Sequence, residues 1–167
     1  MTRDARTFAA AAHGGQTYGA QPYVVHLDAV AALVPDEPEI RAVAYLHDVL
    51  EDTDVQHSTL VQRFGHSVAQ AVALVTDPPG ATRTARKAEL HVRLSGLGID
   101  EPTSALALHV KVADRLANVR SCTASGDARL AMYRREHEAF RPAAYRAGLC
   151  DALWHELDAL LHPPPCS

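Results

Sequence analysis

The apolar residues of this chain recur with the period of a helix. After Pro22, for example, Val25, Ala29 and Leu33 fall on one helical face. No alternating run of β-branched residues and no Asn-Gly or Asp-Gly turn indicates a strand pair. Glycines and prolines separate the periodic stretches, and Pro22 suits the first turn of its helix. The pattern predicts helices at about 3–13, 22–33, 38–49, 58–64, 67–76, 82–94, 103–120, 127–145 and 149–162.

This pattern predicts an all-α fold, a bundle of about eight or nine helices. The chain has 167 residues, of which 47% are apolar, so it can bury a substantial core. It contains no internal repeat and no linker long enough to separate domains. We therefore expect one domain over residues 1–162 and a flexible C-terminal tail at 163–167, where three prolines stand together.

Charge and cysteine usage exclude several classes of partner. The net charge of -4 is unlike that of a basic nucleic-acid-binding domain. No uncharged apolar stretch approaches the ~18 residues of a membrane span. The three cysteines are odd in number and form no C-x-x-C pair, which favours a reducing cytoplasm over a disulfide framework. We expect a cytoplasmic protein with a small-molecule ligand, and the sequence leaves its oligomeric state open.

Four residues on three predicted helices could bind a metal ion. His47 and Asp48 are adjacent within an apolar helix, and His26 and Asp114 each interrupt an apolar run. A carboxylate buried there without a partner would cost several kcal/mol, and a cation would remove that cost. Imidazole and carboxylate ligands suit manganese, iron, zinc or magnesium. Alone, each histidine is more simply a core residue, so these four residues leave the metal site and the core about equally supported.

The neighbouring residues favour the metal site. Glu51 and Asp52 follow one turn after His47, where acids at a helix C-terminus are unfavourable without a cation. On the late helix, Lys111, Asp114 and Asn118 are spaced to lie along one stripe. A metal ligand flanked by a cation and an amide is an arrangement that suits a phosphate substrate.

These residues resemble a known family. His26, His47-Asp48 and Asp114 match the H…HD…D signature of HD-domain phosphohydrolases. A closer resemblance, to the hydrolase domain of RelA/SpoT proteins, is carried by the segments Ala12–Gln16, Pro22–His26, Leu46–Thr53, Phe64–Gly65, Val75–Asp77, Arg86–Lys87 and Val110–Arg120. That domain hydrolyses (p)ppGpp to GDP or GTP and pyrophosphate, usually with manganese. The chain has no room for the other RelA/SpoT domains, so it is similar to the stand-alone small alarmone hydrolases.

The resemblance implies a role for each matching residue. It makes His26, His47, Asp48 and Asp114 the ligands of one divalent metal ion, expected to be manganese, and it makes Glu51 and Asp52 the residues that orient or deprotonate water. The implied substrate-binding residues are Asn118 and Ser121 at the nucleoside, Arg86, Lys87 and Lys111 at the phosphates, and Arg129 and Tyr133 nearby. Lys111 could equally be a structural ion-pair partner.

One departure from the family leaves the substrate open. Tyr18 stands where the family usually has an arginine that packs on guanine. A tyrosine ring can stack on a purine but supplies no positive charge. The first hypothesis is (p)ppGpp hydrolysis at the 3′-diphosphate, and the second is hydrolysis of another nucleotide, such as NADPH at its 2′-phosphate. The third is a non-catalytic nucleotide-binding domain, against which the Glu51–Asp52 pair argues.

Overall fold

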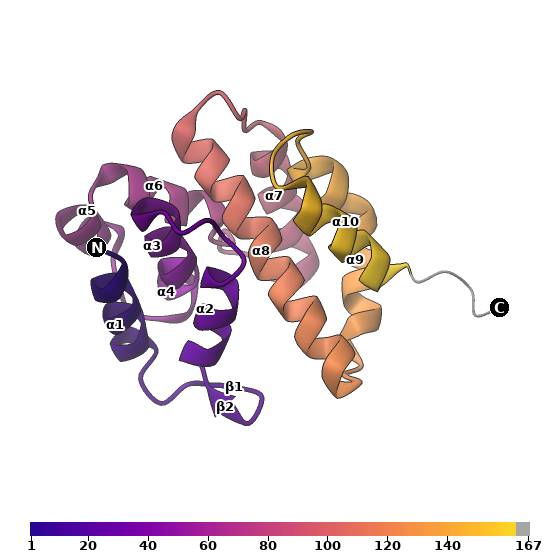
Figure 1. Cartoon of the computed structure of the whole chain (residues 1–167), viewed down its shortest axis with the longest axis horizontal. Helices are drawn as coiled ribbons and strands as arrows, with labels where there is room; N and C mark the ends of the chain where they lie inside the picture. The colour runs from indigo at the N-terminus through magenta and orange to yellow at the C-terminus, as the bar shows by residue number, and fades with distance from the viewer. Residues whose placement is uncertain (163–167) are drawn as a thin grey trace.

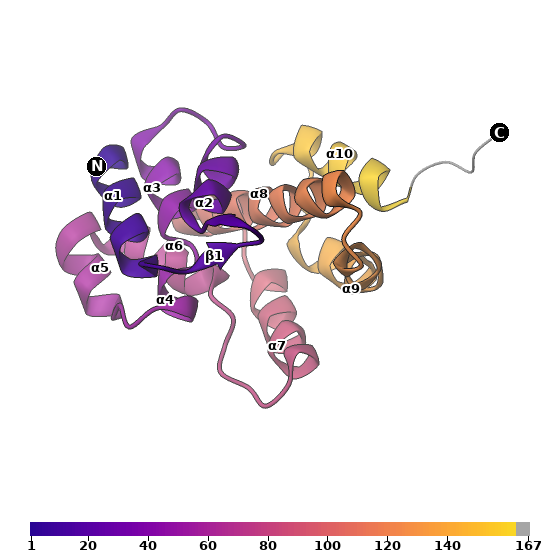
Figure 2. The same cartoon turned by 90° about the horizontal axis from the view of Figure 1, so that it is seen from below.

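A long helix divides the molecule into two groups of helices (Figures 1 and 2). The computed structural model describes residues 1–162, so the expected tail at 163–167 lies outside the described residues. The helices are α1 (Thr2–His13), α2 (Val24–Ala31), α3 (Pro38–Leu46), α4 (Val49–Asp52), α5 (His57–Phe64), α6 (His66–Val75), α7 (Arg83–Ser95), α8 (Pro102–Ser125), α9 (Arg129–Ala144) and α10 (Asp151–Leu161). The prediction of an all-α fold is confirmed. Among the described helices, none has both the length and the apolar character needed to cross a membrane.

Helix α8 is the long helix between the two groups, and each of its faces belongs to a different core. Its alanines Ala107 and Ala113 join the core formed with α1 to α6. Its larger residues Leu108, Val112 and Leu116 join the core formed with α7, α9 and α10. Because both faces are covered, apolar residues surround the helix, as its sequence predicts.

The ends of α8 extend beyond the expected residues 103–120. The carboxylate of Glu101 accepts the backbone N–H groups of Thr103 and Ser104, which caps the first turn. At the other end Gly126 adopts a left-handed conformation with φ 67°, which ends the helix after Ser125. Both signals lie outside the apolar stretch that the prediction used.

A short strand pair corrects the prediction that the chain contains no strands. β1 (Thr17–Tyr18) pairs antiparallel with β2 (Gln21–Pro22), and Gly19 in the turn between them has a φ of 59°. Pro22 therefore belongs to a strand, and α2 begins only at Val24. Two-residue strands carry no alternating pattern, so periodicity could not reveal them.

The predicted helix over 38–49 is divided in two. α3 ends at Leu46, and the single-turn helix α4 begins at Val49. Asp48, at the junction, has φ -101° and ψ -5°. This is the sparsely populated bridge region, where many active-site residues lie. The break therefore falls at the two residues expected to bind metal.

Candidate metal centre

Three separate elements bring the predicted ligands together. His26 lies in the first turn of α2, His47 and Asp48 lie between α3 and α4, and Asp114 lies in the middle of α8. The two histidines are buried, with 3% and 2% of their surface exposed, because apolar helices surround them. Each helix buries its apolar face, and the polar side chains within those faces then point at one another.

Three of the four predicted ligands form a compact group. One ligand atom from each of His26, His47 and Asp114 lies within 4.8 Å of the others. The Oδ1 atom of Asp114 is 3.3 Å from His26 Nε2 and 3.6 Å from His47 Nε2. Two imidazole nitrogens and a carboxylate oxygen at such distances could bind one divalent cation between them.

Asp48 lies beside this group but is not a member of it. Its Oδ2 atom is 2.9 Å from His47 Nε2 and 3.6 Å from His26 Nε2. The same oxygen accepts a hydrogen bond of 2.6 Å from the hydroxyl of Tyr23. Asp48 can therefore join the ligand set by a small side-chain movement, and Tyr23 orients its carboxylate.

The chemistry of His47 fits a bound cation. Its Nδ1 atom lies 2.8 Å from the carbonyl oxygen of Ala44, so Nδ1 carries a proton and donates it. The Nε2 atom is buried and makes no hydrogen bond, although Asp48 Oδ2 is only 2.9 Å away. In the neutral ring, the Nε2 lone pair would face a carboxylate oxygen, which is repulsive. A proton or a metal ion between these atoms removes the repulsion.

The ionisation states of the predicted ligands also favour a bound cation. Burial alone would lower the pKa of His47, but Asp48 and Asp114 outweigh it and raise that pKa well above its ordinary value. Burial would raise the pKa of Asp48, but the nearby charge of His47 lowers it to about 2. Burial would also raise the pKa of Asp114, but His26, His47 and Lys111 close to its carboxylate hold that pKa well below the usual range. Both carboxylates are therefore ionised and ready to bind a cation.

Glu51 and Asp52 lie at the mouth of the site, on α4. The Oε2 atom of Glu51 accepts the backbone N–H of Asp77 at 3.2 Å, and loss of solvent around the carboxyl group, together with the charge of Asp77, raises its pKa. The pKa of Asp52 is raised by desolvation and by the charge of Asp48. The hydroxyl of Tyr23 lies 3.4 Å from Asp52 Oδ2. Carboxylates with raised pKa values are better proton acceptors than ordinary ones.

A cavity of about 130 Å³ adjoins the metal group, and Glu51 lines it. Lys87 and Lys111 lie in its wall, but both ammonium groups already have partners. Lys111 donates to the carbonyl of Val75 at 3.0 Å and lies 3.7 Å from Asp114 Oδ2. Lys87 is 2.7 Å from the carboxylate of Asp77. Lys111 thus has the structural contacts that the sequence left open for it, and it also faces the cavity.

Tyr18 and Asn118 also line this cavity. The hydroxyl of Tyr18 donates to Asn118 Oδ1 at 2.9 Å, and Asn118 Nδ2 donates to Asp114 Oδ1 at 2.6 Å. The ring of Tyr18 stacks on His26, with centroids 4.7 Å apart. Tyr133 lines the same cavity. Tyr18 and Asn118 are therefore linked by hydrogen bonds to Asp114, one of the predicted ligands.

Two predicted substrate residues line a neighbouring cavity. Ser121 and Arg129 border a space of about 420 Å³ that also touches Tyr18 and His26. The guanidinium of Arg129 is held 2.8 Å from the carboxylate of Asp127. These residues lie next to the metal group, with Tyr18 between the two cavities.

Arg86 is not brought to either cavity. It lines a separate hollow beside the loop that follows α6, together with Glu51 and Asp52. Its Nε atom lies 4.0 Å from Asp77 Oδ2. Arg86 and Lys87 are adjacent on α7, so their side chains point in different directions, and only Lys87 reaches the metal cavity.

Comparison with known proteins identifies the family. The profile of a family described as HD domain matches residues 5–150, most of the chain. The chain belongs to the HD-domain family. The similarity to RelA/SpoT proteins that the motifs predict is also confirmed. A guanosine-3′,5′-bis(diphosphate) 3′-pyrophosphohydrolase of Vibrio cholerae is 32% identical over 143 residues, which are 83% of this chain and 20% of that protein. The bifunctional (p)ppGpp synthase/hydrolase SpoT of Escherichia coli is 30% identical over 152 residues, 88% of this chain and 22% of that protein.

This HD domain spans about a fifth of the length of the curated relatives it matches. A solved structure of similar extent is that of a metazoan ortholog of SpoT, described as hydrolysing ppGpp. It superimposes with a TM-score of 0.78 at 25% identity, and the match covers 95% of this chain and 92% of the other.

The HD-domain site contains residues that the sequence prediction missed. Tyr23, Arg83 and Arg115 all line the metal cavity. Tyr23 had a usable signal, because it lies one helical turn before His26. Arg115 directly follows Asp114 in an apolar stretch, which marks a buried cation. Arg83 shows no such signal, since it is one of several basic residues on an amphipathic helix.

Proposed function

We propose that this HD domain hydrolyses (p)ppGpp at the 3′-diphosphate and releases pyrophosphate with GDP or GTP. The observation that carries the proposal is the group of His26, His47 and Asp114, with ionised Asp48 beside it and Glu51 lining the same cavity. The named activities of the relatives point to the same reaction. Residues 1–162 would act as one domain in the cytoplasm, on a small nucleotide, without nucleic acid or membrane.

The four ligands would hold one divalent ion, for which we propose manganese. When bound, the ion supplies Lewis-acid polarisation of a phosphoryl oxygen. Glu51 accepts the proton of the attacking water, because it lines the cavity beside the metal group and its pKa is raised, and Asp52 orients the water through Tyr23. Lys87 and Lys111 line the cavity, where they would stabilise negative charge on the leaving pyrophosphate.

The nucleoside would lie on the side of Tyr18 and Asn118. Asn118 can hydrogen-bond the sugar, and Ser121, Arg129 and Tyr133 surround the neighbouring space. Tyr18 would stack on the base with the ring face that His26 leaves free. Arg86, on the outer hollow, would contact phosphate only after a side-chain movement.

Tyr18 also favours a second candidate, hydrolysis of another phosphorylated nucleotide such as NADPH at its 2′-phosphate. The hydroxyl of Tyr18 donates a hydrogen bond to Asn118, and its ring stacks on His26. Because a phenol is uncharged, Tyr18 adds no positive charge to a base pocket. A site without that charge selects less strongly for the electron-rich oxygen of guanine.

The test is to incubate the purified protein and Mn²⁺ with ppGpp, pppGpp, NADPH, dNTPs and simple monophosphates, and to measure pyrophosphate and phosphate release. We expect pyrophosphate from ppGpp and pppGpp. A double variant, Glu51→Gln with Asp52→Asn, should keep its bound Mn²⁺ and lose turnover. Phosphate from NADPH without pyrophosphate from ppGpp would establish the second candidate, and unchanged turnover in the double variant would reject the roles of the two carboxylates.

A further inference from the structure

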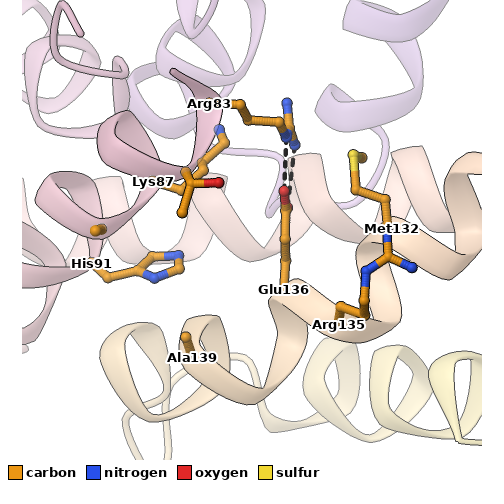
Figure 3. A pocket seen from close by; sticks show the side chains of 9 residues that line it. Arg83, Lys87, His91, Met132, Arg135, Glu136 and Ala139 are labelled. Atoms are coloured by element: carbon orange, nitrogen blue, oxygen red, sulfur yellow. Dashed lines mark hydrogen bonds and ion pairs between the residues drawn. The ribbon is translucent and has the colours of Figure 1, made fainter. Parts of the chain in front are cut away.

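A cavity between α7 and α9 has no role in the proposed reaction. Its volume is about 410 Å³, within the usual range for small-molecule sites. Figure 3 shows α7 and α9 facing each other across it, with side chains from both pointing into the space. It is lined by Arg83, Thr84, Lys87, Ala88, His91, Met132, Arg135, Glu136 and Ala139. Two of these residues, Arg83 and Lys87, also line the metal cavity, so the two cavities adjoin.

The charge of this cavity is positive, although the whole chain is negative. Arg83, Lys87 and Arg135 line it; Arg83 is paired with Glu136, which also lines the cavity, and Lys87 is paired with Asp77, which does not. Desolvation, with the charge of Arg115, lowers the pKa of His91, so its imidazole is neutral at physiological pH. Within the described residues, the exposed guanidinium of Arg135 has no ion-pair partner. The cavity therefore attracts an anion and can contact it through Arg135 without breaking an existing pair.

The cavity is also lined by uncharged side chains, two of which are small. Ala88 comes from α7, and Met132 and Ala139 come from α9, so the two alanines leave the space open. A methionine thioether packs favourably against aromatic rings. An inorganic anion would leave these walls uncovered, whereas a phosphorylated compound with a flat ring would cover them and reach the cations.

We propose that the α7–α9 cavity is a second nucleotide-binding site, in which Arg135 and Arg83 bind phosphate and the Ala88, Met132 and Ala139 wall packs against the base. The nucleotide is either a separate molecule or the far part of one bound at the metal, since the cavities adjoin.

Glu136 connects this site to the metal group. It holds Arg83 at 2.7 Å and Arg115, the neighbour of Asp114, at 3.0 Å (Figure 3 shows the first pair). A phosphate bound to Arg83 would compete with Glu136 for the guanidinium of Arg83. Glu136 is also the partner of Arg115, so its position beside Arg115 and Asp114 would change.

The test is calorimetric titration of the Mn²⁺-loaded protein with GDP and with ADP. Arg135→Glu reverses the charge, and Ala139→Phe fills the space. Both positions are exposed, so the fold should survive, which thermal unfolding checks. The matched controls are Arg3→Glu and Ala11→Phe, at exposed positions on α1 far along the chain.

For a separate nucleotide, we expect two molecules bound per chain in the wild type and the controls, and one in both cavity variants. If one nucleotide spans both cavities, we expect one molecule bound per chain in the wild type, the controls and the cavity variants. The two cavity variants should then bind it at least about tenfold more weakly. Binding equal to the controls, or no binding of either nucleotide to the wild type, would overturn the proposal. The readout needs no hydrolysis, so failure of the proposed reaction leaves this result interpretable.

Discussion

Helix α8 presents Val110 and several alanines to the helices that carry the predicted metal ligands, and it presents leucines and valines to α7, α9 and α10. On the first side, His26 and His47 are buried in the core, and their nitrogens lie close to the carboxylate of Asp114. On the second side, the buried cation Arg115 is paired with Glu136. Its Cζ atom lies 4.9 Å from the ring centroid of Tyr133 and 4.5 Å from that of Phe140. One side has polar atoms that still need a cation, and the other has a cation already paired.

The two sides of α8 therefore suit different roles: one holds side chains in a fixed geometry for metal binding, and the other leaves room for a ligand. The metal side places its ligands at the ends or centres of well-packed helices, which holds their geometry. The opposite side leaves an open space of about 410 Å³ between α7 and α9. We therefore expect changes on the first side to act on metal binding and turnover, and changes on the second side to act on stability and ligand preference.

The largest effect should come from Asp114→Asn, which keeps the shape of the side chain and removes its charge. Mn²⁺ affinity should fall by at least about 100-fold, because a direct ligand is worth more than its supporting contacts. Hydrolysis should fall by roughly a thousandfold. Calorimetry and product release measure the two effects, with Asp54→Asn on the exposed α4–α5 loop as the control. An Asp114→Asn protein with full activity would remove α8 from the metal site.

Phe140→Ala should destabilise the core that α8 forms with α7, α9 and α10. The ring is fully buried against Trp154 and Arg115, so its loss should lower the free energy of unfolding by about 3–5 kcal/mol. Mn²⁺ affinity of the folded protein should stay unchanged, since no ligand touches this core. Urea unfolding and calorimetry separate the two quantities. A parallel loss of metal affinity would show that the two sides are not independent.

Tyr23→Phe should have a smaller effect, confined to the metal side. The change removes the 2.6 Å hydrogen bond to Asp48 and keeps the ring, which stacks on His13. Mn²⁺ affinity should fall by about tenfold, the usual loss for a residue that orients a ligand. Tyr45→Phe, whose hydroxyl lies beside Asp28, is the matched control. Equal affinities in the two variants would mean that Asp48 does not need Tyr23.

Glu136→Gln should have the smallest effect, and that effect should depend on pH. Burial alone would raise the pKa of Glu136, but hydrogen bonds from Arg83 and the charge of Arg115 lower it. A lowered folded pKa stabilises the protein above the ordinary pKa of glutamate, and this contribution is lost as the pH falls through the folded value. The variant should be less stable by roughly 1–2 kcal/mol at neutral pH, because Arg83 is partly exposed.

Urea unfolding of Glu136→Gln and wild type between neutral pH and about pH 3 measures this dependence. The difference between the two curves should shrink as the pH falls towards the lowered pKa of Glu136, where the wild-type side chain also takes up a proton. A constant difference across the range would mean that the charge of Glu136 is not the source of its contribution.

Much of the fold and the metal site could be predicted from local signals. The period of apolar residues predicts the helices, since each helix must bury one face. His47, Asp48 and Asp114 were detectable because charge or imidazole interrupts an apolar run, and such a group requires a partner. Tyr23 could have been found by the same reasoning, because it precedes His26 by one turn.

Other features have no local signal. Arg86 and Lys87 are adjacent and alike in sequence, yet only Lys87 reaches the metal cavity. The break between α3 and α4 at His47 and Asp48 is marked by no glycine or proline, so periodicity predicts one helix there. Glu136 pairs with Arg83 and Arg115 from 53 and 21 residues away, a relation that no spacing rule contains.

The sequence by itself determined that the chain is helical, that it carries the H…HD…D motif, and that acids stand beside that motif. These properties depend on neighbours along the chain, through helical period and the cost of burying charge. Only the tertiary structure decided which cations face the ligands, that Asp48 lies beside the compact group of three, and that α7 and α9 enclose a second cavity. Those properties depend on how the helices cross, and the packing of side chains distant in sequence sets the crossing.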